Sequence, residues 1–154
     1  MSLTHYSDKP LTTIYSTPIA KQEIYFKPTG LWVSVDGPAD WKGWCLNEGF
    51  ALDKLTHASR ILLHKGANIL RIRNASDLDT LTEQYGLGSY RMDWPKIATQ
   101  HHGIIIAPYL WGRRLYPGVD WYYPWDCASG CIWNAAAVRK IIHISPAPLE
   151  EPHA

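Results

Sequence analysis

The chain has 154 residues, with 15 Lys and Arg against 14 Asp and Glu and a formal net charge of +1. This length suits one domain with a buried core, and we expect that domain to span residues 1–145, followed by a flexible tail over 146–154 that contains Pro and Glu. No basic run is longer than a pair such as Arg113-Arg114, which excludes the broad positive surface that duplex nucleic acid requires.

Cysteine usage and the lack of long apolar runs indicate the compartment. Three cysteines, an odd number, do not form a self-contained disulfide framework. No N-terminal stretch has the pattern of a signal peptide, and no run is apolar enough to span a membrane. We therefore expect a reduced, cytoplasmic protein without a membrane partner.

The first part of the chain predicts two strands and a helix. Residues 3–7 form a short strand, and a Pro-Thr-Gly turn at 28–30 leads into a second strand over 31–35. A helix over 39–47 places two tryptophans and a cysteine on one face, because they recur at i, i+3 and i+4.

The middle of the chain predicts two more strands and two more helices. Residues 61–64 and 69–73 flank a turn at 65–68, which indicates a hairpin or a strand-turn-strand unit whose second strand is half exposed. A helix begins with Ser76 as its N-cap and ends near Gly86. Asp93 caps a further helix that runs to about His101.

The last part predicts the centre of the sheet. Residues 104–107 are wholly apolar, as in a central strand, and 108–124 form an aromatic loop. Strands over 131–133 and 139–144 follow. Many strands, few short helices and no repeated strand-helix-strand rhythm favour an α+β fold with a mainly antiparallel sheet. Neither phosphate-binding fingerprint, G-x-G-x-x-G after a strand or G-K-[ST], is present.

Four short segments occur in a suggestive order: Leu3-Thr4-His5-Tyr6, Gly30-Leu31-Trp32-Val33-Ser34, His102-Gly103-Ile104-Ile105 and Cys131-Ile132-Trp133-Asn134. Together they resemble the site elements of the ADP-ribosyltransferase superfamily, in its branch of diphtheria toxin and poly(ADP-ribose) polymerases. The resemblance implies a split, mainly antiparallel sheet around an NAD cleft. It also implies transfer of ADP-ribose from NAD, as substrate, to a protein or nucleic-acid acceptor, as in a toxin or effector.

The resemblance also implies roles for particular residues. His5 would bind the NAD ribose, Gly30 would let the backbone approach the nicotinamide amide, and Trp32 would stack on the nicotinamide ring. The full set of expected NAD-binding residues is His5, Tyr6, Gly30, Leu31, Trp32, Ser34 and Trp41.

The catalytic glutamate of that family has no counterpart at the matching position. Aligning Asn134 with the family's Asp puts Ser129 where the Glu belongs, and no Glu occurs between Glu83 and Glu150. The glutamate's negative charge stabilises a cationic transition state, which a serine cannot do. Asp126 is the nearest acid, so Asp126 and Ser129 are the candidate catalytic residues. Asp126 is equally well explained as a turn residue that accepts backbone N–H bonds.

Other interpretations remain open. The chain could bind NAD or another nucleotide without turning it over. The aromatic loop, with Arg113 and Arg114, could stack sugars or single-stranded bases. Cys127 could serve as a nucleophile, or could join Cys131 and a histidine in a metal site, although the spacing is not that of a zinc knuckle and we expect no metal.

Overall fold

The computed structural model describes residues 1–144. The predicted tail over 146–154 therefore lies outside the described residues. The strands are β1 (Leu3–Ser7), β2 (Ile24–Tyr25), β3 (Leu31–Val35), β4 (His57–Leu63), β5 (Ile69–Ile72), β6 (Met92–Asp93), β7 (Gly103–Ile106), β8 (Ser129–Ile132) and β9 (Val138–Ile144). The helices are α1 (Trp41–Glu48), α2 (Ala75–Tyr85) and α3 (Trp94–Ala98).

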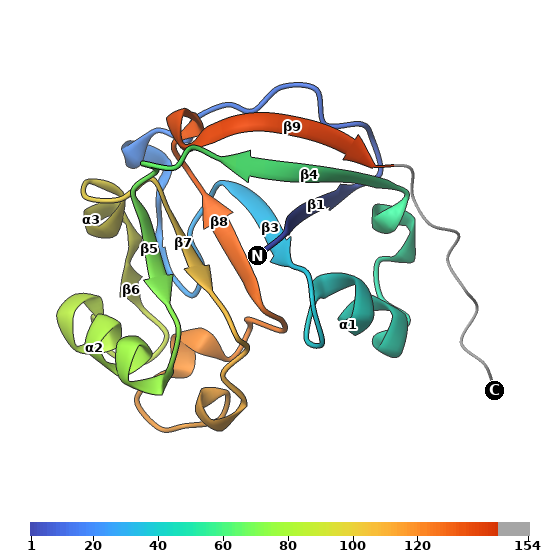
Figure 1. The fold of residues 1–154 in the computed structure, drawn as a ribbon. Helices are drawn as coiled ribbons and strands as arrows, with labels where there is room; N and C mark the ends of the chain where they lie inside the picture. The colour runs from blue at the N-terminus through green and yellow to red at the C-terminus, as the bar shows by residue number, and fades with distance from the viewer. Residues whose placement is uncertain (145–154) are drawn as a thin grey trace.

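Seven of the strands form one sheet in the order β5-β7-β8-β3-β1-β4-β9. All neighbours are antiparallel except β5 and β7. The prediction of an α+β fold with a mainly antiparallel sheet is confirmed. In Figure 1, β4 and β9 run across the direction of β5, β7 and β8. The sheet that was expected to be split is one continuous hydrogen-bonded sheet, and its strands change direction between these two groups.

The parallel strands β5 and β7 belong to a strand-helix-strand unit, which the sequence did not predict. Parallel neighbours cannot be joined by a tight turn and need a crossover connection. Here the chain leaves β5, passes through α2, β6 and α3, and returns in β7. One strand-helix-strand unit is therefore present. The run Gly103–Ile106 is buried throughout, as expected of a central strand.

The predicted hairpin of residues 61–64 with 69–73 is wrong. Both edges of β4 are already occupied, one by β1 and the other by β9. The strand β5 pairs with β7 instead and lies at the edge of the sheet, so the alternative of two strands joined by a turn holds. The turn at 65–68 carries the chain between the two groups of strands rather than folding one strand onto the other.

Helix ends differ from the predictions by small amounts that hydrogen bonds explain. Asn74, not Ser76, is the N-cap of α2, because its side chain accepts the N–H of Asp77 at 2.8 Å. Asp93 caps α3 as predicted, but the helix ends at Ala98 rather than near His101. The first helix begins after its N-cap Asp40, close to the predicted start.

Four aromatic residues of the core are less than 2% exposed: Trp94, Trp121, Tyr122 and Trp125. Buried Trp N–H groups need acceptors. Trp94 donates to the carbonyl of Tyr25 at 3.0 Å, and Trp121 donates to Oγ1 of Thr82 on α2 at 2.9 Å. The first bond ties α3 to β2, and the second ties the segment before β8 to α2.

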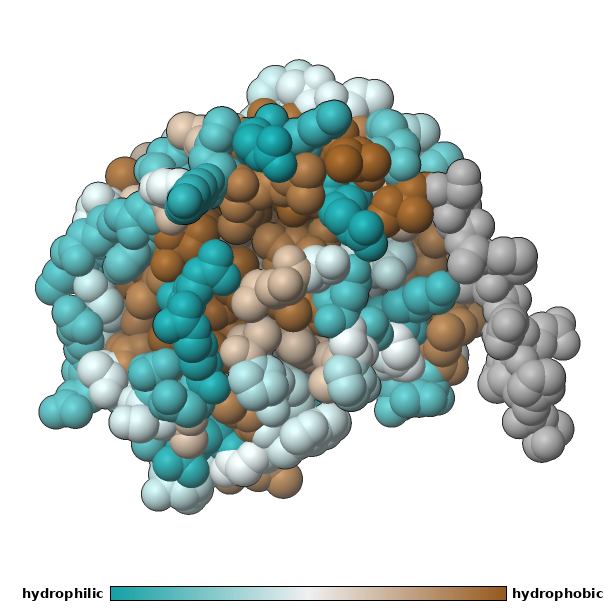
Figure 2. Space-filling model, in the orientation of Figure 1, coloured by the Kyte–Doolittle hydropathy of each residue, from teal (hydrophilic) through white to brown (hydrophobic). Residues whose placement is uncertain are grey.

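The face of the molecule seen in Figure 1 exposes apolar surface over the strands, with polar side chains at its margins (Figure 2). Met1 lies at this face and borders two hollows, one beside Ile61 and the other beside Trp111. Within residues 1–144, no helix has both the length and the apolar character needed to cross a membrane.

Candidate functional site

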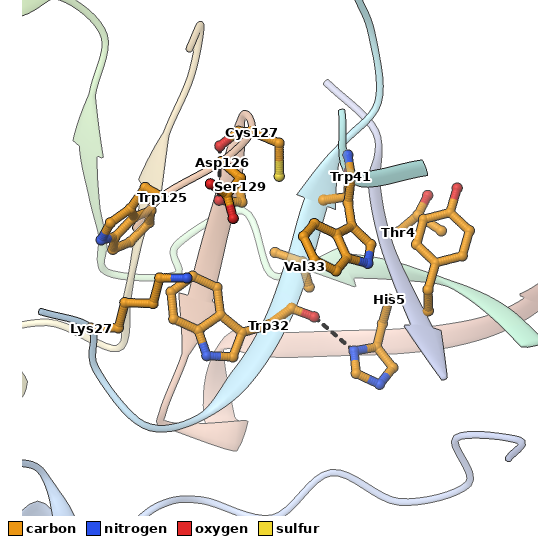
Figure 3. A pocket seen from close by; sticks show the side chains of 12 residues that line it. Thr4, His5, Lys27, Trp32, Val33, Trp41, Trp125, Asp126, Cys127 and Ser129 are labelled. Carbon is orange, nitrogen blue, oxygen red and sulfur yellow. Dashed lines mark hydrogen bonds between the residues drawn. The ribbon is translucent and has the colours of Figure 1, made fainter. Parts of the chain in front are cut away.

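A pocket of about 240 Å³ lies where β1 and β3 meet α1 and the segment before β8 (Figure 3). It is lined by seven of the nine candidate residues from the sequence: His5, Tyr6, Trp32, Ser34, Trp41, Asp126 and Ser129. Five further lining residues were not predicted: Thr4, Lys27, Val33, Trp125 and Cys127.

Strand register explains how distant residues meet in this pocket. Thr4 of β1 lies opposite Ser34 of β3, and Ser34 lies opposite Ser129 of β8. Residues directly opposite on neighbouring strands share a face of the sheet. Three hydroxyl side chains, all buried, therefore form a row across three strands.

Each hydroxyl of this row is engaged with the protein. Thr4 donates to the Asp36 carboxylate at 2.9 Å, and Ser129 donates to the backbone carbonyl of Cys127 at 3.1 Å. Ser34 accepts the backbone N–H of Trp41 at 2.9 Å. Ser34 thereby fixes the first turn of α1 against β3 and holds Trp41 at the pocket.

His5 is positioned by a hydrogen bond between strands. Its Nδ1 lies 2.7 Å from the backbone oxygen of Trp32, as the dashed line in Figure 3 marks. A carbonyl oxygen can only accept, so Nδ1 carries the hydrogen and Nε2 is left as an acceptor in the neutral ring. A ligand hydroxyl could donate to that nitrogen.

Tryptophans form the apolar walls. The ring of Trp32 meets the ring of Trp125 edge to face, with centroids 5.0 Å apart. Trp41 stacks on Trp44 at 5.2 Å with an interplanar angle of 11°. Such walls favour a flat ring as ligand, because aromatic faces attract stacked or edge-on rings.

Two opposite charges enter the pocket. Asp126 has Arg114 as its nearest cation, with Nη2 3.8 Å from Oδ1, and residues 1–144 donate no hydrogen bond to its carboxylate. The interpretation of Asp126 as a turn residue with both oxygens bonded to backbone N–H groups is therefore not supported. Burial raises the pKa of the Asp126 carboxyl, and Lys27 and Arg114 partly offset that rise.

Lys27 extends over the ring of Trp32 (Figure 3), with Nζ 5.4 Å from the centroid of that ring. Burial lowers the pKa of its ammonium group, while the Asp126 carboxylate acts to raise it. One signal for this residue is present in the sequence, a cation directly before the Pro-Thr-Gly turn, but no periodicity directs its side chain inward.

Gly30 and Leu31 do not line the pocket. A Cβ on Gly30 would lie 2.6 Å from the carbonyl oxygen of Ile132, so the close approach that requires glycine is to β8. Leu31 pairs with Ile132 and packs against the hydrophobic core. Neither residue is placed to contact a ligand in this pocket.

The structure does not support Cys127 as a nucleophile or as a metal ligand. Cys127 lines the pocket but is only 4% exposed, and burial raises the pKa of its thiol to about 12. A thiolate nucleophile needs the opposite shift. Among residues 1–144, no three His, Cys, Asp or Glu side chains converge on a point where they could hold a metal ion.

The aromatic loop divides between core and surface. Trp121, Tyr122 and Trp125 are buried, which removes them from any stacking platform. The exposed aromatic residues of this segment are Trp111, Tyr116 and Tyr123. Arg113 forms a two-point ion pair with Asp79, both bonds being 2.9 Å long.

The chain matches no protein-family model, no curated protein and no solved structure.

Proposed function

We propose that the protein transfers ADP-ribose from NAD to a macromolecular acceptor and releases nicotinamide. The observation that carries the proposal is that His5, Trp32 and Asp126, which come from the first strand, the third strand and the segment before β8, line one pocket. The resemblance of the sequence to ADP-ribosyltransferases calls for such a meeting of residues.

In this reaction the bond between C1 of the nicotinamide ribose and the ring nitrogen breaks. The electron pair leaves with nicotinamide, an acceptor lone pair forms the new bond to C1, and the acceptor's proton passes to solvent. Positive charge develops on the ribose, and a carboxylate nearby stabilises it. Asp126 is the residue that supplies this charge, while His5 orients the ribose and Trp32 stacks on nicotinamide.

The size of the pocket limits what it encloses. A volume of about 240 Å³ is below the roughly 300–1,000 Å³ typical of sites that enclose a whole drug-sized ligand. The pocket suits the nicotinamide and ribose of NAD, with the adenosine half lying outside its mouth. The nearby cation Lys27 suits the phosphates that join the two halves.

A second candidate is NAD binding without turnover. Ser129 of β8 stands where the family's glutamate is expected, and its hydroxyl hydrogen is already donated to Cys127. If Asp126 does not reach the ribose, the same pocket binds NAD and leaves it intact.

Incubation and soaking with NAD separate these functions. Nicotinamide release that Asp126→Asn reduces by on the order of 100-fold, with NAD affinity nearly unchanged, supports the transferase. Intact NAD in the pocket without release supports the non-catalytic alternative. Absence of both binding and release at millimolar NAD contradicts both. Asp120→Asn, an exposed acid of the preceding loop, is the control variant.

A further inference from the structure

Lys27 differs from the other cations near the pocket in its lack of an ion-pair partner. Arg114 lies 3.8 Å from Asp126, and Arg60 lies 3.8 Å from Asp36. Within residues 1–144, no carboxylate oxygen comes within 4.0 Å of the Lys27 ammonium. Among the described residues, the carboxylate that acts most strongly on Lys27 is Asp126, at more than 4.0 Å from its ammonium.

The surroundings of Lys27 make an uncompensated charge costly. The side chain is half buried, and its ammonium lies over the ring of Trp32. A charge removed from water is tolerated when a counter-charge and hydrogen bonds replace its hydration. Burial lowers the pKa of this ammonium despite the attraction of Asp126, so the protein alone compensates the charge incompletely.

No carboxylate of the described residues is paired with Lys27, which leaves its ammonium open to an anion. Lys27 and Arg114 both act on Asp126, and Glu48, a further carboxylate that acts on Asp126, is exposed, so water and salt screen its charge. The Cys127 thiol is uncharged at neutral pH, because burial raises its pKa to about 12. An anionic ligand group that contacts Lys27 would meet no second carboxylate of the pocket lining besides Asp126.

We propose that Lys27 forms an anion subsite that binds a phosphate group of a nucleotide ligand, and that the pocket thereby selects nucleotides over nucleosides. This inference rests on the proposed function for the identity of the ligand. A 5′-phosphorylated ribose carries hydroxyls and a phosphate on one small ring, which matches a carboxylate acceptor and a cation that line the same pocket. A lysine ammonium is a compact point charge with three donors and is a common phosphate ligand.

The test compares two ligands that differ only in the phosphate, nicotinamide mononucleotide and nicotinamide riboside. Calorimetry measures the affinity of both for the wild type, Lys27→Met and Lys27→Arg. Methionine keeps the apolar stem over Trp32 and removes the charge. Lys21→Met, an exposed lysine on the same segment, is the matched control.

We expect the wild type to bind the mononucleotide on the order of tenfold or more tightly than the riboside, since bonds to charged groups contribute that much. Lys27→Met should remove this preference through the mononucleotide alone, Lys27→Arg should restore most of it, and Lys21→Met should change neither ligand. The preference should also weaken with added salt in the wild type.

An equal loss of affinity for both ligands in Lys27→Met would show a structural role for Lys27 and overturn the subsite. A wild type that binds the two ligands equally well, or binds neither, would also overturn the subsite. The proposed function fails separately. Mononucleotide binding that depends on Lys27, without any release of nicotinamide from NAD, would overturn the transferase and keep the subsite. Nicotinamide release with an unchanged KM for NAD in Lys27→Met would overturn the subsite and keep the transferase.

Discussion

Trp32 contacts three other residues of the pocket through different parts of itself. Its backbone oxygen accepts the hydrogen bond of His5, its ring edge meets Trp125, and Lys27 lies over its face. The backbone contact does not depend on the side chain. Replacement of the indole therefore tests the ring while leaving the position of His5 to the sheet.

Trp32→Ala should weaken NAD binding by about 1–3 kcal/mol, the usual loss when an aromatic stacking face is removed from a base. Titration calorimetry of the folded variant gives this difference directly. An affinity equal to that of the wild type would show that the Trp32 ring packs within the protein and does not stack on NAD. Circular dichroism of the variant checks that the fold is retained.

The ionisation of Asp126 predicts the acid limb of the pH profile. The carboxylate is the form that can stabilise positive charge, and burial raises its pKa above the usual value of about 3.9. As pH falls through that raised pKa, the carboxylate is protonated and kcat/KM for NAD cleavage should fall. The loss should thus occur at a higher pH than for a solvent-exposed aspartate.

Two variants should move this limb in opposite directions. Arg114 lowers the pKa of Asp126 and Glu48 raises it. Arg114→Gln should therefore shift the loss of activity to higher pH, and Glu48→Gln should shift it to lower pH. Steady-state rates measured across the acid range provide the test. Shifts of the same sign, or none, would mean that another group controls the limb.

Sequence motifs located several pocket residues on β1 and β3, but they missed Lys27, which lies outside the strands. Trp32 and Ser34 alternate with core residues on β3, and His5 lies on β1, so a motif that finds these strands finds the three residues. Lys27 precedes its strand, in a turn whose path the sequence does not fix. Its entry into the pocket depends on the packing of Trp32 against Trp125, which come from segments far apart in the chain.

At the scale of elements, the tight contact of β3 with β8 determines the geometry of the pocket floor, because Ser34 and Ser129 face each other across it. Gly30, directly before β3, is the point of closest approach. A Cβ there would lie 2.6 Å from the Ile132 oxygen and 2.9 Å from Cys131 Sγ. Backbone atoms of a central strand cannot move aside without breaking the ladder.

Gly30→Ala should therefore destabilise the protein by about 1–3 kcal/mol, as overpacking in a well-packed region does. Urea unfolding measures the change. Gly112→Ala is the control, because a Cβ at that position meets nothing within 4 Å, and it should change stability by less than about 0.5 kcal/mol. Equal effects of the two substitutions would contradict the close contact as the reason for glycine at position 30.

The positions of strands and helices were predicted better than the pairing of the strands. Most strands of the large sheet and the N-cap of α3 followed from local signals, such as the apolar run of β7 and the capping side chain of Asp93. Pairing is not local. The hairpin expected after Leu63 fails because β4 finds partners in β1 and in the last strand, β9, neither of which adjoins it in the sequence.

At the scale of the whole molecule, the aromatic residues of the loop before β8 join the core to the pocket. Trp121 and Trp125 contact each other edge to face, with centroids 6.1 Å apart, and Trp125 continues to the pocket wall. The sequence predicted an aromatic loop over 108–124, because proline and glycine interrupt it, and did not predict that Trp121 is buried. This burial depends on packing against distant segments such as α2, to which Trp121 donates a hydrogen bond. Local sequence patterns do not predict such contacts.

Trp121→Ala should accordingly affect stability and the pocket together. The side chain is 1% exposed and donates to Thr82 on α2, so its removal leaves a large cavity and breaks one of the two hydrogen bonds of the Thr82 hydroxyl, which also donates to the Leu78 carbonyl. Truncation of a buried tryptophan typically costs about 3–5 kcal/mol. Thermal and urea unfolding should show a loss of this size. NAD affinity, measured where the variant is still folded, should also fall, because Trp125 loses the ring that supports it.

Trp111 provides the comparison that isolates burial from residue type. It lies on the same loop, is also a tryptophan and is 65% exposed. Trp111→Ala should change the free energy of unfolding by less than about 0.5 kcal/mol, as surface substitutions usually do, and should leave NAD affinity unchanged. A destabilisation similar to that of Trp121→Ala would mean that the loop packs as one unit. A small loss in both variants would contradict the aromatic core as the support of the pocket wall.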